Sequence, residues 1–91
     1  STIILKYPLV KNKRWIAKRA GTKIDYEIVD TGIEVEVKAG VFVNCVKVRE
    51  RVKNSSSWVY VYYAPWVGKI LTTVAGKGFE NRVEELISYE K

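Results

Sequence analysis

The sequence predicts an all-β fold, a single curved antiparallel sheet in meander order or a partly closed barrel, with about six or seven strands. Apolar and polar side chains alternate over most of the 91 residues, which is typical of half-buried strands. Short clusters of turn-forming residues separate these runs. The apolar content, 47% of the chain, leans toward Val, Ile, Tyr and Trp and includes no Met, which favours pleated sheet over a helical bundle.

The length predicts one domain over residues 1–91. The chain does not begin with methionine, and we expect it to be excised from a longer cell-envelope or secreted protein. No apolar run approaches the roughly 20 residues that a membrane-spanning helix needs, so we expect these residues not to span a membrane.

The first half of the chain predicts an extended arm, a short strand and a hairpin. The arm comprises residues 3–5, and the short strand residues 15–19. Residues 23–28 alternate strictly, as do residues 33–38, and both segments place acidic side chains opposite apolar ones. Residues 30–32, Asp-Thr-Gly, predict a tight turn that joins the two segments into a β-hairpin.

A long strand is expected over residues 41–52, followed by a polar loop over residues 53–57. Phe42 and Cys45 are three residues apart, so they share a face only if a β-bulge near residues 43–44 shifts the register.

The second half predicts a central strand over residues 58–63, because both of its faces are apolar. Pro65 ends this strand, and residues 67–75 form the next. For the tail we prefer a terminal strand at residues 83–89 over a short helix capped by Asn81.

Five aromatic side chains are expected to share the inner face of the curved sheet: Trp15, Phe42, Trp58, Tyr60 and Tyr62.

The composition argues against catalysis. Histidine, the usual general base and metal ligand, is missing, and Cys45 therefore lacks the partner that activates a cysteine nucleophile. We expect Cys45 to be a small buried side chain. Asp25 with Glu27, and Glu34 with Glu36, form pairs of acids, but we expect alternation to leave both pairs in solvent rather than in the buried setting that a catalytic acid needs. The sequence thus predicts no enzyme, no cofactor and no metal.

The net charge of +6 is concentrated in the first 24 residues, which hold seven basic side chains and no acid. The acidic segments that follow favour cross-strand pairing within one sheet. An anion-binding surface for nucleic acid or phospholipid is the weaker interpretation, and we expect no nucleic-acid partner. The residues that would form this surface are Lys11, Lys13, Arg14, Lys18 and Arg19.

Three segments together carry a resemblance to a known family. Residues 39–48 read AGVFVNCVKV, residues 62–70 read YYAPWVGKI, and residues 85–89 read ELISY. They resemble the AGxFxNCxxV, YYAPGVGxV and ELxSY segments of a small β domain found in uncharacterised bacterial secreted proteins and lipoproteins. Trp66 stands where that pattern favours glycine. The resemblance implies an extracytoplasmic location and a structural or binding module, and it brings no catalytic residues.

We therefore expect a non-catalytic structural or protein-interaction module whose partner, or second copy, binds through an exposed strand edge. The alternatives are a domain that binds a small apolar ligand or lipid with a curved aromatic sheet, and nucleic-acid binding through the basic N-terminal segment. The aromatic side chains of the candidate ligand or partner surface are Trp15, Trp58, Tyr60, Tyr62 and Trp66.

Overall fold

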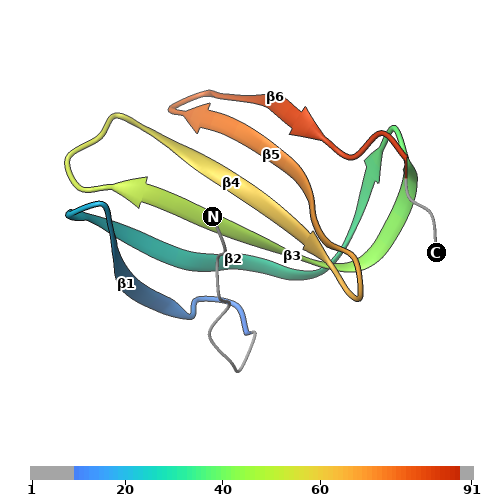
Figure 1. Cartoon of the computed structure of the whole chain (residues 1–91), viewed down its shortest axis with the longest axis horizontal. Helices are drawn as coiled ribbons and strands as arrows, with labels where there is room; N and C mark the ends of the chain where they lie inside the picture. The colour runs from blue at the N-terminus through green and yellow to red at the C-terminus, as the bar shows by residue number, and fades with distance from the viewer. Residues whose placement is uncertain (1–9, 89–91) are drawn as a thin grey trace.

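A computed structural model describes residues 10–88, and within this range the chain forms six β-strands and no helix (Figure 1). The strands are β1 (Arg14–Arg19), β2 (Thr22–Val37), β3 (Gly40–Val52), β4 (Ser57–Ala64), β5 (Gly68–Gly76) and β6 (Phe79–Glu85). They lie in one sheet in the order of the sequence, and every neighbouring pair is antiparallel. The prediction of an all-β antiparallel meander is confirmed.

The predicted hairpin between residues 23–28 and 33–38 is wrong, because both segments belong to the single 16-residue strand β2. The break in alternation at residues 30–32 is a bulged bend rather than a chain reversal. The register with β3 shifts three times between Ile28 and Val35, while pairing with β3 continues on both sides. Gly32, with a φ of 64°, supplies the left-handed backbone at this bend. Figure 1 shows the far end of β2 turned up from the rest of the sheet.

The bend changes which residues of β2 face the core. Before it, even-numbered residues such as Tyr26 and Ile28 lie on the face that also carries Val48 and Val61, which we call face A. After it, Val35 and Val37 pack with Cys45 and Tyr62 on the opposite side, face B. The protein thus has two core clusters on opposite faces of one sheet.

The first core cluster lies in the open half of the molecule, formed by β1 and the parts of β2 and β3 that pair before the bend. Its centre is Tyr26, Ile28 and Val48, with Trp15 and Tyr63 packed against it. The second lies in the curled half, where residues 33–46 fold toward β4, β5 and β6. Its buried members are Val35, Val37, Cys45, Tyr62, Ala64, Ile70 and Leu71.

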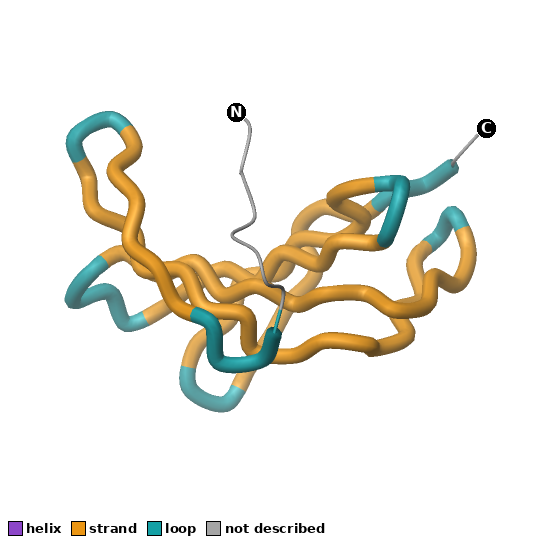
Figure 2. The backbone as a smooth tube through the Cα atoms, turned by 90° about the horizontal axis from the view of Figure 1, so that it is seen from below, coloured by secondary structure: helices purple, strands orange, loops and turns teal. Residues whose placement is uncertain are grey.

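The curled half is held closed by the turn between β2 and β3. The amide of Ala39 donates to the carbonyl of Leu86 at 3.0 Å, and the amide of Lys38 donates to Glu85 Oε2 at 2.8 Å. These contacts join the end of β2 to the end of β6, although no ladder forms between the two strands. Figure 2 shows the described residues as one strongly twisted layer, and β1 and β6 remain its edges.

Other predictions of local structure are confirmed. Val43 and Asn44 form the expected bulge in β3, where Asn44 has a φ of 58° and the register skips from Cys45 to Phe42. Strand β4 is central, and Cys45 is fully buried. The tail is a strand, as preferred, but β6 begins and ends earlier than the expected range of 83–89.

The predicted inner face needs correction at Trp15. The register places Trp15 opposite Tyr26 on face A, whereas Trp58, Tyr60 and Tyr62 lie on face B. Trp15 is separated from the three β4 aromatics because the strands pair without a register shift in this part of the sheet. Alternation along each strand therefore decides which face a side chain occupies. The arm expected at residues 3–5 lies outside the described residues, as does the Tyr89 end of the ELxSY-like segment.

Candidate functional site

The curl of β2 creates a groove of about 420 Å³ on face B, between residues 30–36 and the inward surface of β3–β6. We call it the acidic groove. Its apolar floor includes Ile33, Val35 and Leu71. Six charged residues line it or its rim: Asp30, Glu34, Glu36 and Glu80 are acidic, and Lys47 and Arg82 are basic. The groove is therefore acidic on balance, in a protein whose net charge is +6.

Glu80 is the best-anchored charge in the groove. The hydroxyl of Tyr62 donates to its Oε2 at 2.5 Å, and the hydroxyl of Thr73 donates to the same oxygen at 2.6 Å. Lys47 Nζ lies 3.5 Å from Oε1. Burial on its own would raise the pKa of Glu80, but the two hydroxyls and Lys47 outweigh it, and the net pKa is lowered. Glu80 is thus held as a carboxylate.

Lys47, on β3, completes this cluster. Its Nζ lies 4.1 Å from the ring centroid of Tyr60 and 5.2 Å from that of Tyr62, which are cation–π distances. Burial lowers the pKa of Lys47, but the Tyr62 hydroxyl and the charge of Glu80 more than compensate, so the net pKa is raised. The Lys47–Glu80 pair is therefore satisfied within the protein.

The remaining acids of the groove are turned to other partners or to solvent. Asp30 Oδ1 accepts a hydrogen bond from the amide of Thr31 at 3.0 Å. Glu34 and Glu36 are exposed, and none of these three acids forms an ion pair with another residue in the range 10–88. These carboxylates are available to a cationic group that enters the groove.

The predicted aromatic surface does not form one platform. Trp15 stacks on Tyr26 at 5.4 Å on face A. Trp58 lies beneath the guanidinium of Arg51, at 5.3 Å. Tyr60 is covered by Lys47, and Tyr62 is buried in the second core cluster.

Trp66 stands apart from the other aromatic residues, in the turn between β4 and β5. It is fully exposed and has a φ of 67°. Trp66 thus adopts a backbone conformation that glycine adopts more readily.

The predicted anion-binding residues lie along β1 and the turn before it. Arg14 pairs with Glu27 at 3.6 Å, and Arg19 donates to the Tyr26 hydroxyl at 3.0 Å. Lys18 lies directly opposite Lys23 across the β1–β2 ladder. The expected pairing of basic and acidic strands is confirmed for Arg14 and Glu27, and the other two cations of β1, Lys18 and Arg19, lie on an exposed edge. Lys11 and Lys13 lie beside this edge, in the segment that leads into β1.

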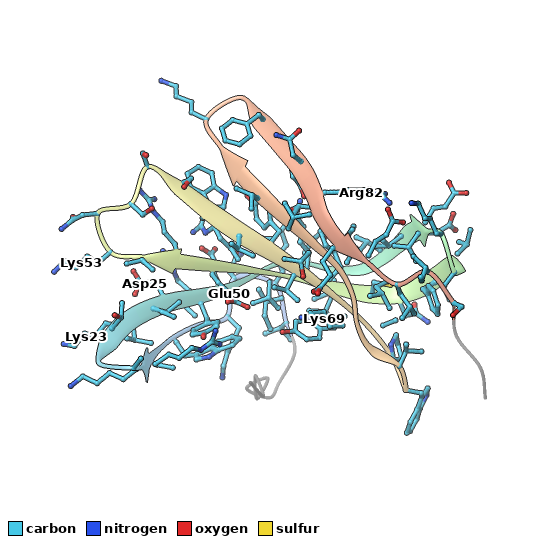
Figure 3. The ribbon with its side chains drawn as sticks, turned by 45° about the horizontal axis from the view of Figure 1, so that its top comes forward. Lys23, Asp25, Glu50, Lys53, Lys69 and Arg82 are labelled. Carbon is cyan, nitrogen blue, oxygen red and sulfur yellow. The ribbon has the colours of Figure 1, made fainter. Side chains whose placement is uncertain are left out.

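The pairing at Glu27 also involves β3, because Arg49 contacts the same carboxylate. Together with Arg14, Arg51 and Lys53, this arginine surrounds a small basic hollow of about 140 Å³. Figure 3 shows Lys23, Asp25 and Lys53 at this end of the sheet, away from Arg82.

A second unusual carboxyl group, Glu50, lies on face A. Its Oε2 is buried and has no hydrogen-bond partner among residues 10–88. Burial raises the pKa of Glu50, and the charges of Arg19 and Lys69 only partly offset this effect. The buried hydroxyl of Tyr63, likewise without a partner, has its pKa raised to about 12, first by burial and then by Glu50. One signal for this site existed in the sequence, because Glu50 interrupts the apolar series Val46, Val48 and Val52.

Sequence reasoning missed the acidic groove itself. Glu80, Thr73 and Lys47 come from three strands, and only the bend in β2 brings Asp30 and Glu34 near them. No local motif marks such a site.

Comparison of the chain with known protein families, curated proteins and solved structures finds no match. Over residues 10–88, no helix is long and apolar enough to cross a membrane. The same residues contain no cluster of three or more acidic or cysteine side chains arranged to hold a metal ion.

Proposed function

We propose that this chain is a non-catalytic protein-interaction module of an extracytoplasmic protein, and that it binds a basic, extended segment of a partner in the acidic groove and along β6. The observation that carries the proposal is the concentration of acidic side chains in the groove of a strongly basic chain.

The acidic charge of the groove favours a partner with basic side chains. Asp30, Glu34 and Glu36 form no ion pair among the described residues, so a lysine or arginine side chain gains their attraction without displacing an existing ion pair. The groove is open to solvent, which limits each exposed ion pair to less than about 1 kcal/mol. Affinity then requires several contacts at once, as an extended segment provides.

The position of the groove supplies those further contacts. Glu80 and Arg82 belong to β6, which is an edge strand with exposed side chains over most of its length. An edge strand offers its free backbone amides and carbonyls to another strand. A partner segment paired with β6 would direct alternate side chains toward face B, where the groove opens.

The apolar-ligand alternative has less support, because six of the residues that line the groove are charged. A hydrophobic ligand would have to desolvate these groups without pairing them.

The proposal is tested by calorimetric titration of the chain with a short peptide that alternates lysine and valine. We expect saturable binding that weakens as salt is added, because the charges lie near solvent. A peptide that alternates glutamate and valine is the matched control and should not bind.

Variants locate the binding surface. Glu34→Gln combined with Glu36→Gln removes two exposed acids of the groove and should weaken binding of the lysine peptide by about tenfold. Asp25→Asn combined with Glu50→Gln removes two acids outside the groove and should leave binding unchanged. Equal effects of the two double variants, or equal binding of the two peptides, would refute the proposal.

A further inference from the structure

We infer that the basic segment that binds along β6 is strand β1 of a second copy of this chain. This inference rests on the proposed function and names the partner of the same site. It follows from the direction, the charge and the side-chain order of the two edge strands.

The direction of the strands permits repeated addition. Six strands in an antiparallel meander place β1 and β6 at opposite edges and in opposite directions. A second copy in the same orientation therefore brings its β1 antiparallel to β6 of the first. The two strands also match in length, with six and seven residues.

The charges of the edges are complementary. Strand β1 has three cations and no acid, whereas β6 has three acids and Arg82. Pairing β1 with β1, or β6 with β6, would place like charges opposite each other, which is unfavourable. Charge therefore selects the heterologous contact between β1 and β6 over a symmetric dimer.

One register satisfies both charge and face. With Lys18 opposite Glu80, Ile16 faces Arg82, and the bulge between Arg82 and Glu84 brings Glu85, rather than Glu84, to the same face as Arg14. In β1, Arg14, Ile16 and Lys18 share face B, because Arg14 pairs with Glu27 and alternation fixes the other two. The basic side chains of the incoming strand then lie on the side where the acidic groove opens.

The same register gives the other face of β1 a partner. Arg19 lies opposite Phe79, whose side chain is exposed and whose ring is placed against Gly76. An arginine beside an aromatic ring is a favourable pair at a strand edge.

The association state of the whole chain tests this inference. Sedimentation velocity over a range of concentrations should show reversible association beyond a dimer, because a heterologous contact leaves one edge free at each end. Added salt should weaken this association. A chain that stays monomeric at millimolar concentration and low salt would overturn the inference.

Charge exchange provides the specific test. We expect Arg14→Glu/Lys18→Glu to weaken self-association at least about tenfold, and Asn81→Lys/Glu84→Lys to do the same. When the two double variants are mixed, the unaltered β1 of one meets the unaltered β6 of the other, so association should return. Lys53→Glu/Lys77→Glu changes the net charge as much as the β1 variant does, but it alters residues in turns, and it should associate like the unaltered chain.

These results separate the inference from the proposed function. If the lysine peptide binds in the groove while the chain stays monomeric, or while mixing fails to restore association, the β1 partner is wrong and the groove function stands. If the chain associates as described but the peptide does not bind, the edge contact stands without the groove.

Discussion

The curled and open halves of the sheet each contain a glutamate with a shifted pKa, and the two shifts have opposite directions. In the curled half, Glu80 accepts hydrogen bonds from Tyr62 and Thr73 and pairs with Lys47, and its pKa is lowered. In the open half, Glu50 has a buried oxygen that no described residue hydrogen-bonds, and its pKa is raised.

The difference comes from the cross-strand neighbours of each group. On face B, Lys47, Tyr62 and Thr73 belong to the three strands that precede β6, and all three contact Glu80. Before the bend the strands continue side by side, and Glu50 has only its neighbours on the same face, which are mainly apolar or aromatic. The side chains on the neighbouring strands, rather than the residue type, decide whether each of these two carboxyl groups is satisfied.

The largest expected effect tests whether the two halves unfold together. Ile70 belongs to the second core cluster and Ile28 to the first, and both are almost fully buried. Replacing either with alanine should lower the free energy of unfolding by about 2–5 kcal/mol. Because β2 and β3 run through both halves, we expect a single denaturant transition for each variant, followed by fluorescence and by circular dichroism.

Two separate transitions in Ile28→Ala would show that the curled half folds without the open half. The comparison between the halves would then describe two folding units rather than one.

The next effect concerns the satisfied carboxylate. Tyr62→Phe removes one of the two hydroxyl donors to Glu80 and should lower the free energy of unfolding by about 1.5–3 kcal/mol, as for a hydrogen bond to a charged group. The lowered pKa of Glu80 stabilises the fold above its unfolded value of about 4.3, and this stabilisation is lost as the pH falls through the folded value. The variant should therefore lose less stability than the unaltered chain between pH 7 and pH 3, as measured by urea unfolding.

Tyr60→Phe is the matched control for Tyr62→Phe, because no described hydrogen bond from its hydroxyl reaches Glu80. An equal effect of the two substitutions on the pH profile would contradict the assignment.

A smaller effect of opposite sign is expected at Glu50. Its raised pKa means that the fold is favoured when the group is protonated, and that this contribution is lost as the pH rises through the folded pKa. Glu50→Gln removes the buried charge and should raise the free energy of unfolding at pH 7 by about 1 kcal/mol. The gain should shrink at pH 4 and below, where the carboxyl group of the unaltered chain is protonated. Destabilisation by Glu50→Gln at pH 7 would show that the charge has a partner.

The smallest effect is expected at Trp66, which belongs to neither core cluster. Trp66→Gly relieves a positive φ at a fully exposed position and should raise the free energy of unfolding by less than about 1 kcal/mol. Thermal unfolding measures this change, and binding of the lysine peptide should be unaffected. If the substitution instead weakens peptide binding, the partner surface extends beyond the groove to this turn.

The sequence was sufficient for the fold class and most strand positions, because alternation and turn residues are local signals. The bulge at residues 43–44 followed from the spacing of Phe42 and Cys45, and the structure contains it. At residues 30–32 the loss of alternation had two possible meanings. A loss of alternation beside Gly32 is common to a tight turn and a bulged bend, and only the pairing of β2 with β3 distinguishes them.

The candidate site could not be predicted for the same reason. Its residues come from five strands, and their convergence depends on the direction of one bend. The interpretation as a hairpin placed Glu34 and Glu36 on a separate strand, between the strands at residues 23–28 and 41–52, and gave no reason to bring them near Glu80. The predicted basic residues of β1 are on one strand, where local sequence is enough to place them together.

Amide hydrogen exchange along β6 tests the central claim most directly. We predict that, at a concentration where the chain is monomeric, the lysine peptide slows exchange at the outward-facing amides of residues 79–84 and leaves exchange along β1 unchanged. Slowed exchange along β1 with none along β6, or no change in either strand under saturating peptide, would contradict the claim that the curled half binds a basic strand.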